Sequence, residues 1–275
     1  MTFDRVMMVD WSGGNDRGPR PTRDAIWIGE TGRAPVYCRN RQTAEDLLSK
    51  RITDALAAGA RLMVGFDFPF GYPVGMAQAI CGGGVLDLWD WLEARIEDTP
   101  RANNRFDLAG GINLSLGTPG PFWGNGLKRD VPGLARTKAG YANPFDDRRV
   151  CETRSRGTFT VWQLAGAGSV GSQVLMGLPV LARLRQRFPV SVWPFEPVDA
   201  PVVFTELWPG LIEPVVRKTA GIRDAVQVDL LAHGIGRLNP DRLEAMLAVD
   251  VPDARTEEGW ILGLGFEEEL QDICR

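Results

Sequence analysis

Three acidic residues stand at or near the ends of apolar segments: Asp10 after residues 5–9, Asp67 after residues 61–66, and Glu206 within residues 202–208. An unpaired charge inside a segment that is otherwise core-like is costly. A divalent cation removes that cost, because Mg²⁺ prefers oxygen ligands and is often held by one or two carboxylates plus water. Adjacent parallel strands bring their carboxyl ends side by side, so Asp10 and Asp67 are expected to converge. For each acid taken alone, a turn cap or an ion pair with arginine is the alternative.

Acids of this kind suit phosphoryl chemistry, in which two metal ions about 4 Å apart clamp the attacking and leaving oxygens. The histidine content points the same way. His233 is the one histidine of the chain, so a multi-histidine metal site is excluded and a Ser-His-Asp triad is disfavoured. We interpret His233 as a structural residue, and any hydrolytic chemistry would depend on Asp and Glu together with a metal.

A second motif is the sequence Gly-Ala-Gly-Ser-Val-Gly at residues 166–171, which follows the apolar residues 159–164 and precedes a helical pattern. A strand, this motif and a helix form the context of a dinucleotide-binding turn, with the pyrophosphate at the helix N-terminus. The next acid, Glu196, comes 25 residues after Gly171, and the motif does not lie in a first βα turn. Two other interpretations stay open: a glycine-rich helix start that packs closely, and an anion site in which Gly168 and Ser169 face the substrate.

The third feature is a basic segment, residues 99–149, in which Gly, Pro and Asn interrupt every periodic pattern. It has eight basic and four acidic residues, a net charge of +4, whereas the whole chain has −4. Trp123, Lys128 and Arg129 lie in its middle. Cations beside an aromatic ring suit a phosphate-bearing or stacked substrate. The alternative is a solvated loop.

Composition and charge limit the class of protein. The chain has 275 residues, of which 44% are hydrophobic and 24% charged, as in a soluble globular domain. Its net charge of −4 excludes a globally basic nucleic-acid binder. The four cysteines are far apart in the sequence, which favours reduced thiols in the cytoplasm. The N-terminus lacks the apolar core of a signal peptide, and no window has the roughly 20 apolar residues of a membrane span, so no membrane partner is expected.

The periodic patterns predict an α/β fold. Three strands over residues 5–10, 24–30 and 35–39 should form an antiparallel meander. A helix over 43–58, with Thr43 as N-cap, and a strand over 61–67 follow. The remaining predicted elements are helices over 85–98, 168–187 and 222–236, and strands over 190–195 and 202–208. We therefore predict one domain over residues 1–275, with a long loop insertion at about 99–149.

The acidic motifs also resemble a known family. The strand ending in Val9-Asp10-Trp11-Ser12, the segment Gly65-Phe66-Asp67-Phe68-Pro69-Phe70-Gly71 and the segment Thr205-Glu206-Leu207-Trp208-Pro209 are similar to the uncharacterised DUF429 group. That group resembles the ribonuclease H-like superfamily and is described as predicted nucleases. The resemblance implies a five-stranded mixed sheet, and it implies that Asp224 is the acid of the last helix. That helix often has two acids in close succession, but here the next acid, Asp229, follows five residues later.

Together these observations predict a metal-dependent phosphodiester hydrolase, with Mg²⁺ or Mn²⁺ as cofactor and a phosphate-bearing substrate, nucleic acid being one candidate. The predicted catalytic and metal-binding residues are Asp10, Asp67, Glu206 and Asp224. The predicted substrate-binding residues are Ser12, Trp123, Lys128, Arg129, Gly168 and Ser169. Two alternatives remain. One is a nucleotide-binding or cofactor-metabolism protein that uses the glycine-rich segments at 12–14 and 166–171. The other is a non-catalytic member of the fold. Actin-like ATPases share the fold but need two copies of it, and no repeat is visible.

Overall fold

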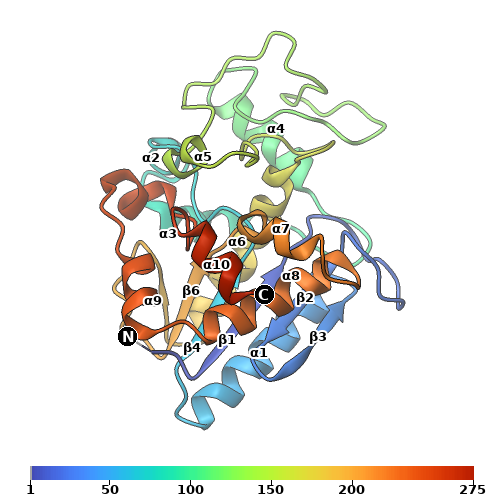
Figure 1. Ribbon diagram of the computed structural model, residues 1–275. Coiled ribbons are helices and arrows are strands. Elements are labelled where there is room, and N and C mark those ends of the chain that lie inside the picture. Colours follow the sequence, from blue (N-terminus) through green and yellow to red (C-terminus); the bar gives the residue numbers. More distant parts are fainter. Residues whose placement is uncertain (1) are drawn as a thin grey trace.

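The computed structural model describes residues 2–275, and within this range it contains a mixed sheet of six strands (Figure 1). Their order across the sheet is β3-β2-β1-β4-β6-β5. The strands are β1 (Arg5–Asp10), β2 (Ile26–Glu30), β3 (Arg33–Cys38), β4 (Leu62–Phe66), β5 (Val190–Val192) and β6 (Val202–Glu206). The α/β class and every predicted strand are confirmed. The expected count of five is wrong, because the short strand β5 extends the parallel half by one edge strand.

Both kinds of strand pairing meet at β1. This strand pairs antiparallel with β2, which pairs antiparallel with β3, so the predicted meander is confirmed. On its other side β1 is parallel to β4, and β4 is parallel to β6. The register sets Val9 beside Phe66 and Phe66 beside Glu206. The carboxyl ends of three neighbouring strands therefore lie side by side.

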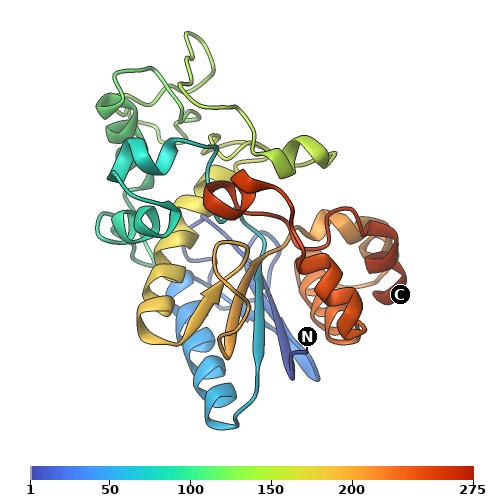
Figure 2. The ribbon, with the colours of Figure 1, turned by 90° about the vertical axis from the view of Figure 1, so that its left-hand side faces the viewer.

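Helices cover both faces of the sheet, and Figure 2 shows the two helical layers on either side of it. On one face lie α1 (Arg41–Ala57), α3 (Val85–Glu93) and α6 (Val170–Arg187). On the other face α8 (Arg223–Gly236) packs against β1 and β2, with α9 (Pro240–Leu247) and α10 (Glu267–Ile273) beside it. The alternation of β1 explains this, because Met7 and Val9 point into the first core and Val6 and Met8 into the second.

The segment between α3 and α6 forms a cap above the carboxyl ends of the strands, at the top of Figure 1. It is not the structureless loop that the sequence predicts, because α4 (Arg105–Ser115) and α5 (Val150–Arg154) lie in it. We call residues 94–169 the insertion. Residues 116–149 have neither helix nor strand, but they are not simply solvated. Phe122 is fully buried and packs edge-to-face against Tyr72 and Trp162, which lie outside this range.

Helix α4 escaped the sequence analysis because Gly110 and Gly111 interrupt its pattern. The structure gives Gly110 a packing role: a Cβ there would lie 2.3 Å from the carbonyl oxygen of Pro132. The helix thus needs a residue of low helix propensity where it touches the loop that follows.

Some predicted boundaries are also corrected. Helix α1 begins at Arg41 with Asn40 as N-cap. Thr43, the third residue of the helix, is the other partner in the capping box. Helix α3 ends at Glu93 rather than at residue 98. The apolar residues 159–164, which a dinucleotide-binding turn would need as its strand, form no strand. The sequence analysis did not anticipate α2 (Met76–Cys81), a 3₁₀ turn (Pro209–Ile212), α7 (Glu213–Val216) or a π turn (Ala254–Glu258).

Two properties of the described chain bear on its surroundings. All four cysteines are free thiols, and burial raises the pKa of Cys38 to about 12. Among residues 2–275, no helix has both the length and the apolar character that crossing a bilayer requires.

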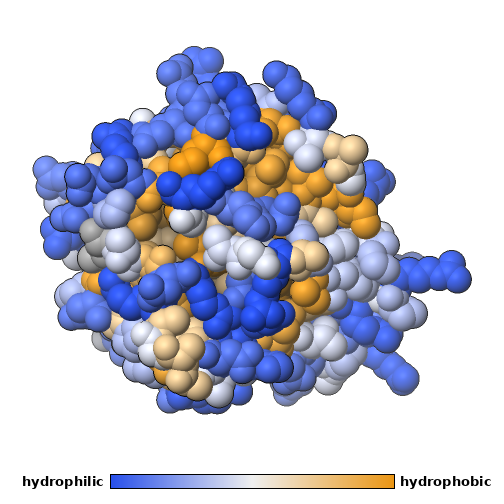
Figure 3. All heavy atoms as spheres, turned by 60° about the horizontal axis from the view of Figure 1, so that its bottom comes forward, coloured by the Kyte–Doolittle hydropathy of each residue, from blue (hydrophilic) through white to orange (hydrophobic). Residues whose placement is uncertain are grey.

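The face opposite the insertion is largely hydrophilic, with hydrophobic residues in separate bands between polar side chains (Figure 3).

Candidate active site

Asp10 and Asp67 lie together at the carboxyl ends of the parallel strands β1 and β4, as the sequence predicts. The backbone N–H of Asp67 donates to the carbonyl oxygen of Val9 at 3.1 Å, which continues the strand pairing to this point. The two carboxyl groups are in hydrogen-bonding contact. The backbone N–H of Trp11 donates to Oδ1 of Asp67 at 2.7 Å and fixes that carboxyl group. The pair is a direct consequence of the register of two apolar strands.

The environment of the pair favours protonation. Burial raises the pKa of Asp10 well above its ordinary value, and the charges of Asp67 and Asp224 raise it further. Burial also raises the pKa of Asp67 to about 7, although hydrogen bonds with Asp10 and with the Trp11 N–H act in the opposite direction. Two buried carboxylates in contact repel each other unless one holds a proton or a cation lies between them. The pair is therefore a site at which a bound proton or cation would stabilise the protein.

Asp224, in the first turn of α8, faces this pair from the second layer of helices. It accepts a hydrogen bond from the backbone N–H of Asp24 at 2.7 Å, and burial raises its pKa. Asp24, which the sequence analysis did not single out, has a left-handed backbone with φ of 53°. Across residues 2–275, no group of three or more His, Cys, Asp or Glu side chains is arranged to hold a metal ion. Asp10 and Asp67 are thus a two-carboxylate centre, with Asp224 as a further negative charge nearby.

Glu206 forms an ion pair and does not join Asp10 and Asp67. Its side chain is buried, and its two oxygens accept from Nη1 and Nη2 of Arg149 at 2.7 and 2.6 Å. The backbone N–H of Phe70 donates to the same carboxylate at 3.0 Å. A bidentate arginine neutralises a carboxylate and occupies its lone pairs. The structure therefore realises the alternative that the sequence left open for this acid, an ion pair with arginine, and does not bring Glu206 into the pair.

The carboxyl pair opens onto a cleft with a volume of about 1680 Å³, between the strand ends, the insertion and the start of α8. Six arginines line it: Arg17, Arg105, Arg154, Arg156, Arg217 and Arg223. Arg217 and Arg223 are already paired with Glu213. Phe159 and Trp208 add aromatic surface, and the side chain of Phe159 is 49% exposed. The cleft thus combines cations, aromatic rings and the carboxyl pair. These arginines are not among the predicted binding residues, since most lie outside the basic segment 99–149.

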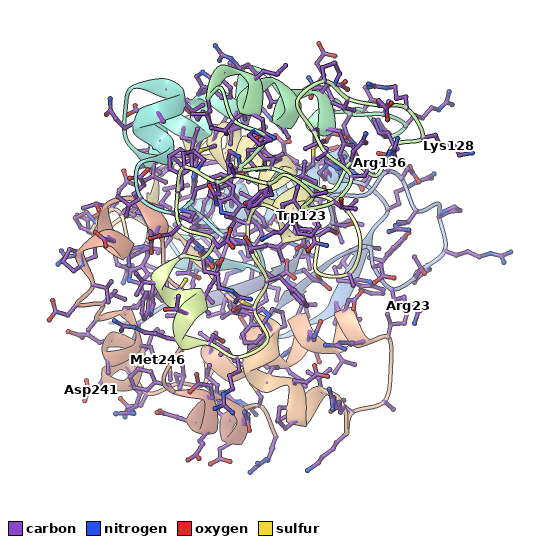
Figure 4. All side chains as sticks on the ribbon, turned by 90° about the horizontal axis from the view of Figure 1, so that it is seen from above. Arg23, Trp123, Lys128, Arg136, Asp241 and Met246 are labelled. Carbon is purple, nitrogen blue, oxygen red and sulfur yellow. The ribbon has the colours of Figure 1, made fainter. Side chains whose placement is uncertain are left out.

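Of the six predicted substrate-binding residues, Ser12, Gly168 and Ser169 line this cleft, and the other three lie elsewhere. Arg129 is exposed and forms an ion pair with Asp107 at 2.6 Å. Lys128 and Arg136 project from the outer margin of the insertion in Figure 4, whereas Trp123 lies nearer its middle. The ammonium of Lys138 lies 5.6 Å from the centre of the Trp123 ring. The sequence identified the right segment of the chain but not the side of it that faces the cleft.

The glycine-rich motif at 166–171 does not have the context of a dinucleotide-binding turn, because no strand precedes it. Gly166 and Gly168 have positive φ, and a Cβ on Gly171 would lie 2.4 Å from the carbonyl oxygen of Val161. The third glycine therefore allows the start of α6 to pack against the insertion. The close-packing interpretation is supported at Gly171, while Gly168 and Ser169 stay at the wall of the cleft.

Fold and site together define an α/β protein with a carboxyl pair at neighbouring strand ends, facing an arginine-lined cleft. Comparison with known proteins adds no relative: no family model matches the chain, and neither the curated proteins nor the solved structures give a significant match.

Proposed function

We propose that the protein is a metal-dependent hydrolase of phosphate esters, of the phosphodiesterase kind, with a ribonuclease H-like fold similar to that of the DUF429 group. The observation that carries the proposal is the contact between the Asp10 and Asp67 carboxyl groups at the floor of the cleft. The strand order supports the fold, because an antiparallel meander followed by parallel strands is what the resemblance implies; β5 is then an added edge strand. The free cysteines support a cytoplasmic location.

The residues present fit Mg²⁺ or Mn²⁺. Two adjacent carboxyl groups with raised pKa values can be neutralised by a cation in place of a shared proton. Two protein carboxylates are enough for Mg²⁺, which completes its shell with water and substrate phosphates. Asp224 adds negative charge at this position, and Glu206 does not fit because Arg149 occupies its oxygens. Asp10 and Asp67 would hold such a metal, which would polarise a phosphoryl oxygen and lower the pKa of a bound water.

The chain itself supplies positioning and contacts for phosphate. The Trp11 N–H fixes Asp67, so the carboxyl group is held before substrate arrives. Arginine binds phosphate oxygens with two parallel N–H donors, and the cleft offers Arg17, Arg105, Arg154 and Arg156 without a carboxylate partner in residues 2–275.

The test is a thermal-unfolding titration with Mg²⁺ and Mn²⁺, followed by hydrolysis of an activated phosphodiester. The wild type should gain about 2.7 kcal/mol of stability when the metal reaches 100 times its dissociation constant. Asp67→Asn should fold but lose both the metal response and the turnover. Asp54→Asn is the matched control, since Asp54 is an exposed carboxylate paired with Lys50 outside the cleft. Equal metal responses in wild type and Asp67→Asn, or retained turnover, would refute the proposal.

A further inference from the structure

Arg105, the first residue of α4, lines the cleft and lacks a carboxylate partner. No aspartate or glutamate in the described range 2–275 forms an ion pair with it, although it is only partly exposed. Its neighbour Arg41 takes the nearest acid, Asp98, in a bidentate pair with distances of 2.6 and 2.5 Å. A half-buried cation without a counter-ion is costly. Arg105 therefore stands where an anion would stabilise the folded protein.

The guanidinium of Arg105 is held in one orientation. Its Nε donates to Oγ of Ser172 at 2.9 Å, and its Nη1 donates to Oδ1 of Asn103 at 2.6 Å. Its central carbon lies 4.4 Å from the centre of the Phe106 ring. Arginine has five N–H donors, and these two bonds use two of them. Nη2 donates to no acceptor within residues 2–275, so a fixed group with spare donors faces the cleft.

The electrostatic environment shows the same need for an anion. Burial lowers the pKa of Arg105 to about 10, and the positive charge of Arg41 lowers it further, against the opposing effect of Asp98. Arg105 is the arginine whose pKa is lowered in the described chain, whereas those of Arg39, Arg149, Arg183 and Arg242 are raised by acidic partners. A negatively charged ligand would instead raise the pKa of Arg105.

Arg105 belongs to the same wall of the cleft as the loop that follows β1. Asn103, which accepts from Arg105, donates through Nδ2 to Oδ1 of Asn15 at 2.9 Å. Arg17, two residues after Asn15, also lines the cleft, and no ion pair neutralises it in the described residues. Its guanidinium lies against Gly14, with Nη2 3.3 Å from the position of a Cβ there. Two unneutralised arginines are thus placed on segments that are hydrogen-bonded to each other.

This wall is continuous with the carboxyl pair. Ser172, the acceptor for Arg105 Nε, packs under Gly13, where a Cβ would lie 2.8 Å from the Ser172 backbone. The next residue, Gln173, donates from Nε2 to the carbonyl oxygen of Trp11 at 2.7 Å. Trp11 in turn fixes Asp67. A ligand group held by Arg105 would lie in the same cleft as the proposed reaction centre.

We propose that Arg105, with Arg17 on the loop hydrogen-bonded to its segment, forms a phosphate-binding subsite that holds a phosphate group of the ligand. The planar guanidinium presents parallel N–H donors that match two phosphate oxygens. The assignment of this phosphate to the substrate rests on the proposed function. The binding of phosphate itself needs neither metal nor turnover.

The test measures binding of inorganic phosphate and of AMP to the metal-free protein in EDTA, at low ionic strength, by calorimetry. Arg105→Gln should weaken both about ten- to a hundredfold, since it removes charge-assisted hydrogen bonds. Arg105→Lys keeps the positive charge but lacks the planar guanidinium. Its phosphate affinity should therefore lie between those of the wild type and Arg105→Gln. Arg95→Gln should bind like the wild type, because Arg95 is exposed, stacks on Trp91 at 4.1 Å as Arg105 does on Phe106, and lies outside the cleft. Binding of AMP but not of free phosphate would identify an ester as the ligand.

A second measurement on the wild type covers the case in which Arg105→Gln does not fold. Phenylglyoxal modifies accessible arginines, and mass spectrometry locates the label. Phosphate should slow modification of Arg105 and leave that of Arg95 unchanged. Equal labelling of Arg105 with and without phosphate, or unchanged affinity in a folded Arg105→Gln, would overturn the subsite. Phosphate binding that persists when the metal titration fails would refute the hydrolase proposal and leave the subsite in place.

Discussion

Asp67 and Glu206 both lie at the carboxyl ends of neighbouring parallel strands, yet Glu206 has a cationic partner and Asp67 does not. Glu206 lies beside Phe66 in the register, one residue before the position of Asp67. Each carboxylate accepts a backbone N–H, from Phe70 at Glu206 and from Trp11 at Asp67. Glu206 is then neutralised by Arg149, whereas Asp67 meets a second acid, Asp10. A protein cation thus neutralises Glu206, whereas within residues 2–275 none neutralises the Asp10–Asp67 pair.

The difference separates a structural site from a candidate for chemistry. Arg149, which directly precedes α5 in the insertion, also donates from Nε to Glu152 at 2.9 Å and from Nη1 to the carbonyl oxygen of Glu258 at 2.8 Å. It thereby fastens the insertion to the sheet and to the C-terminal segment. Burial alone would lower the pKa of Arg149, but the negative charges around it raise the value. The Arg149–Glu206 pair holds the insertion in place, and the Asp10–Asp67 pair lies in the cleft between the strand ends and the insertion.

Removal of Arg149 should give the largest effect on stability. Arg149→Met leaves Glu206 and Glu152 buried without a cation, and loss of one partner of a buried pair costs about 3–5 kcal/mol. Urea unfolding followed by tryptophan fluorescence measures the free energy of unfolding. Lys50→Met is the control, since Lys50 is exposed and pairs with Asp54 one turn along α1, and such exposed pairs contribute about 0–1 kcal/mol. Equal effects of the two variants would show that the buried pair is not the fastening.

The carboxyl pair should respond to pH in the opposite sense from a stabilising ion pair. The folded protein holds the Asp67 proton up to a pKa of about 7, whereas the unfolded chain releases it near the ordinary value of 3.8. The folded state binds more protons in this window, so the free energy of unfolding of the metal-free protein should fall as pH rises from about 4 to 7. The loss is on the order of 3 kcal/mol.

Asp67→Asn isolates this contribution. The variant keeps an oxygen for the Trp11 N–H but carries no charge, so its stability should fall less across the same pH window. At pH 8, in EDTA, it should be more stable than the wild type, in contrast to Arg149→Met. Urea unfolding at several pH values measures the difference. A parallel pH dependence of the two proteins would mean that Asp67 is ionised in the folded state throughout.

The smallest effect is expected at the outer margin of the insertion. Arg129→Gln breaks an exposed ion pair with Asp107, and such pairs contribute about 0–1 kcal/mol. Because Arg129 does not line the cleft, phosphate affinity should also match the wild type within error. Calorimetry under the conditions used for Arg105→Gln checks this. A drop like that of Arg105→Gln would restore the sequence-based assignment of Arg129 as a substrate ligand.

Much of the scaffold was readable from local pattern. The apolar segments ending in Asp10 and Asp67 predicted two neighbouring strands, and the structure confirms β1 and β4 with those acids at their ends. Periodicity also located α1, α6 and α8 to within a few residues. It failed in the insertion, where α4 contains Gly110 and Gly111 and where residues 159–164 are apolar without forming a strand. There the hydrophobic residues serve a local aromatic cluster, which has no helical or strand period.

The sequence by itself determined that carboxylates would gather at the ends of the central strands, since strand periodicity and register depend on short-range pattern. Only the tertiary structure decided which of them has a cation. Arg149 meets Glu206 across 57 residues, and Arg105 is left without an acid because Arg41 takes Asp98, 57 residues away. Charge pairing acts through space at a few ångströms, and residue spacing along the chain carries no record of it. The division between structural and candidate functional acids is therefore a property of the packed molecule.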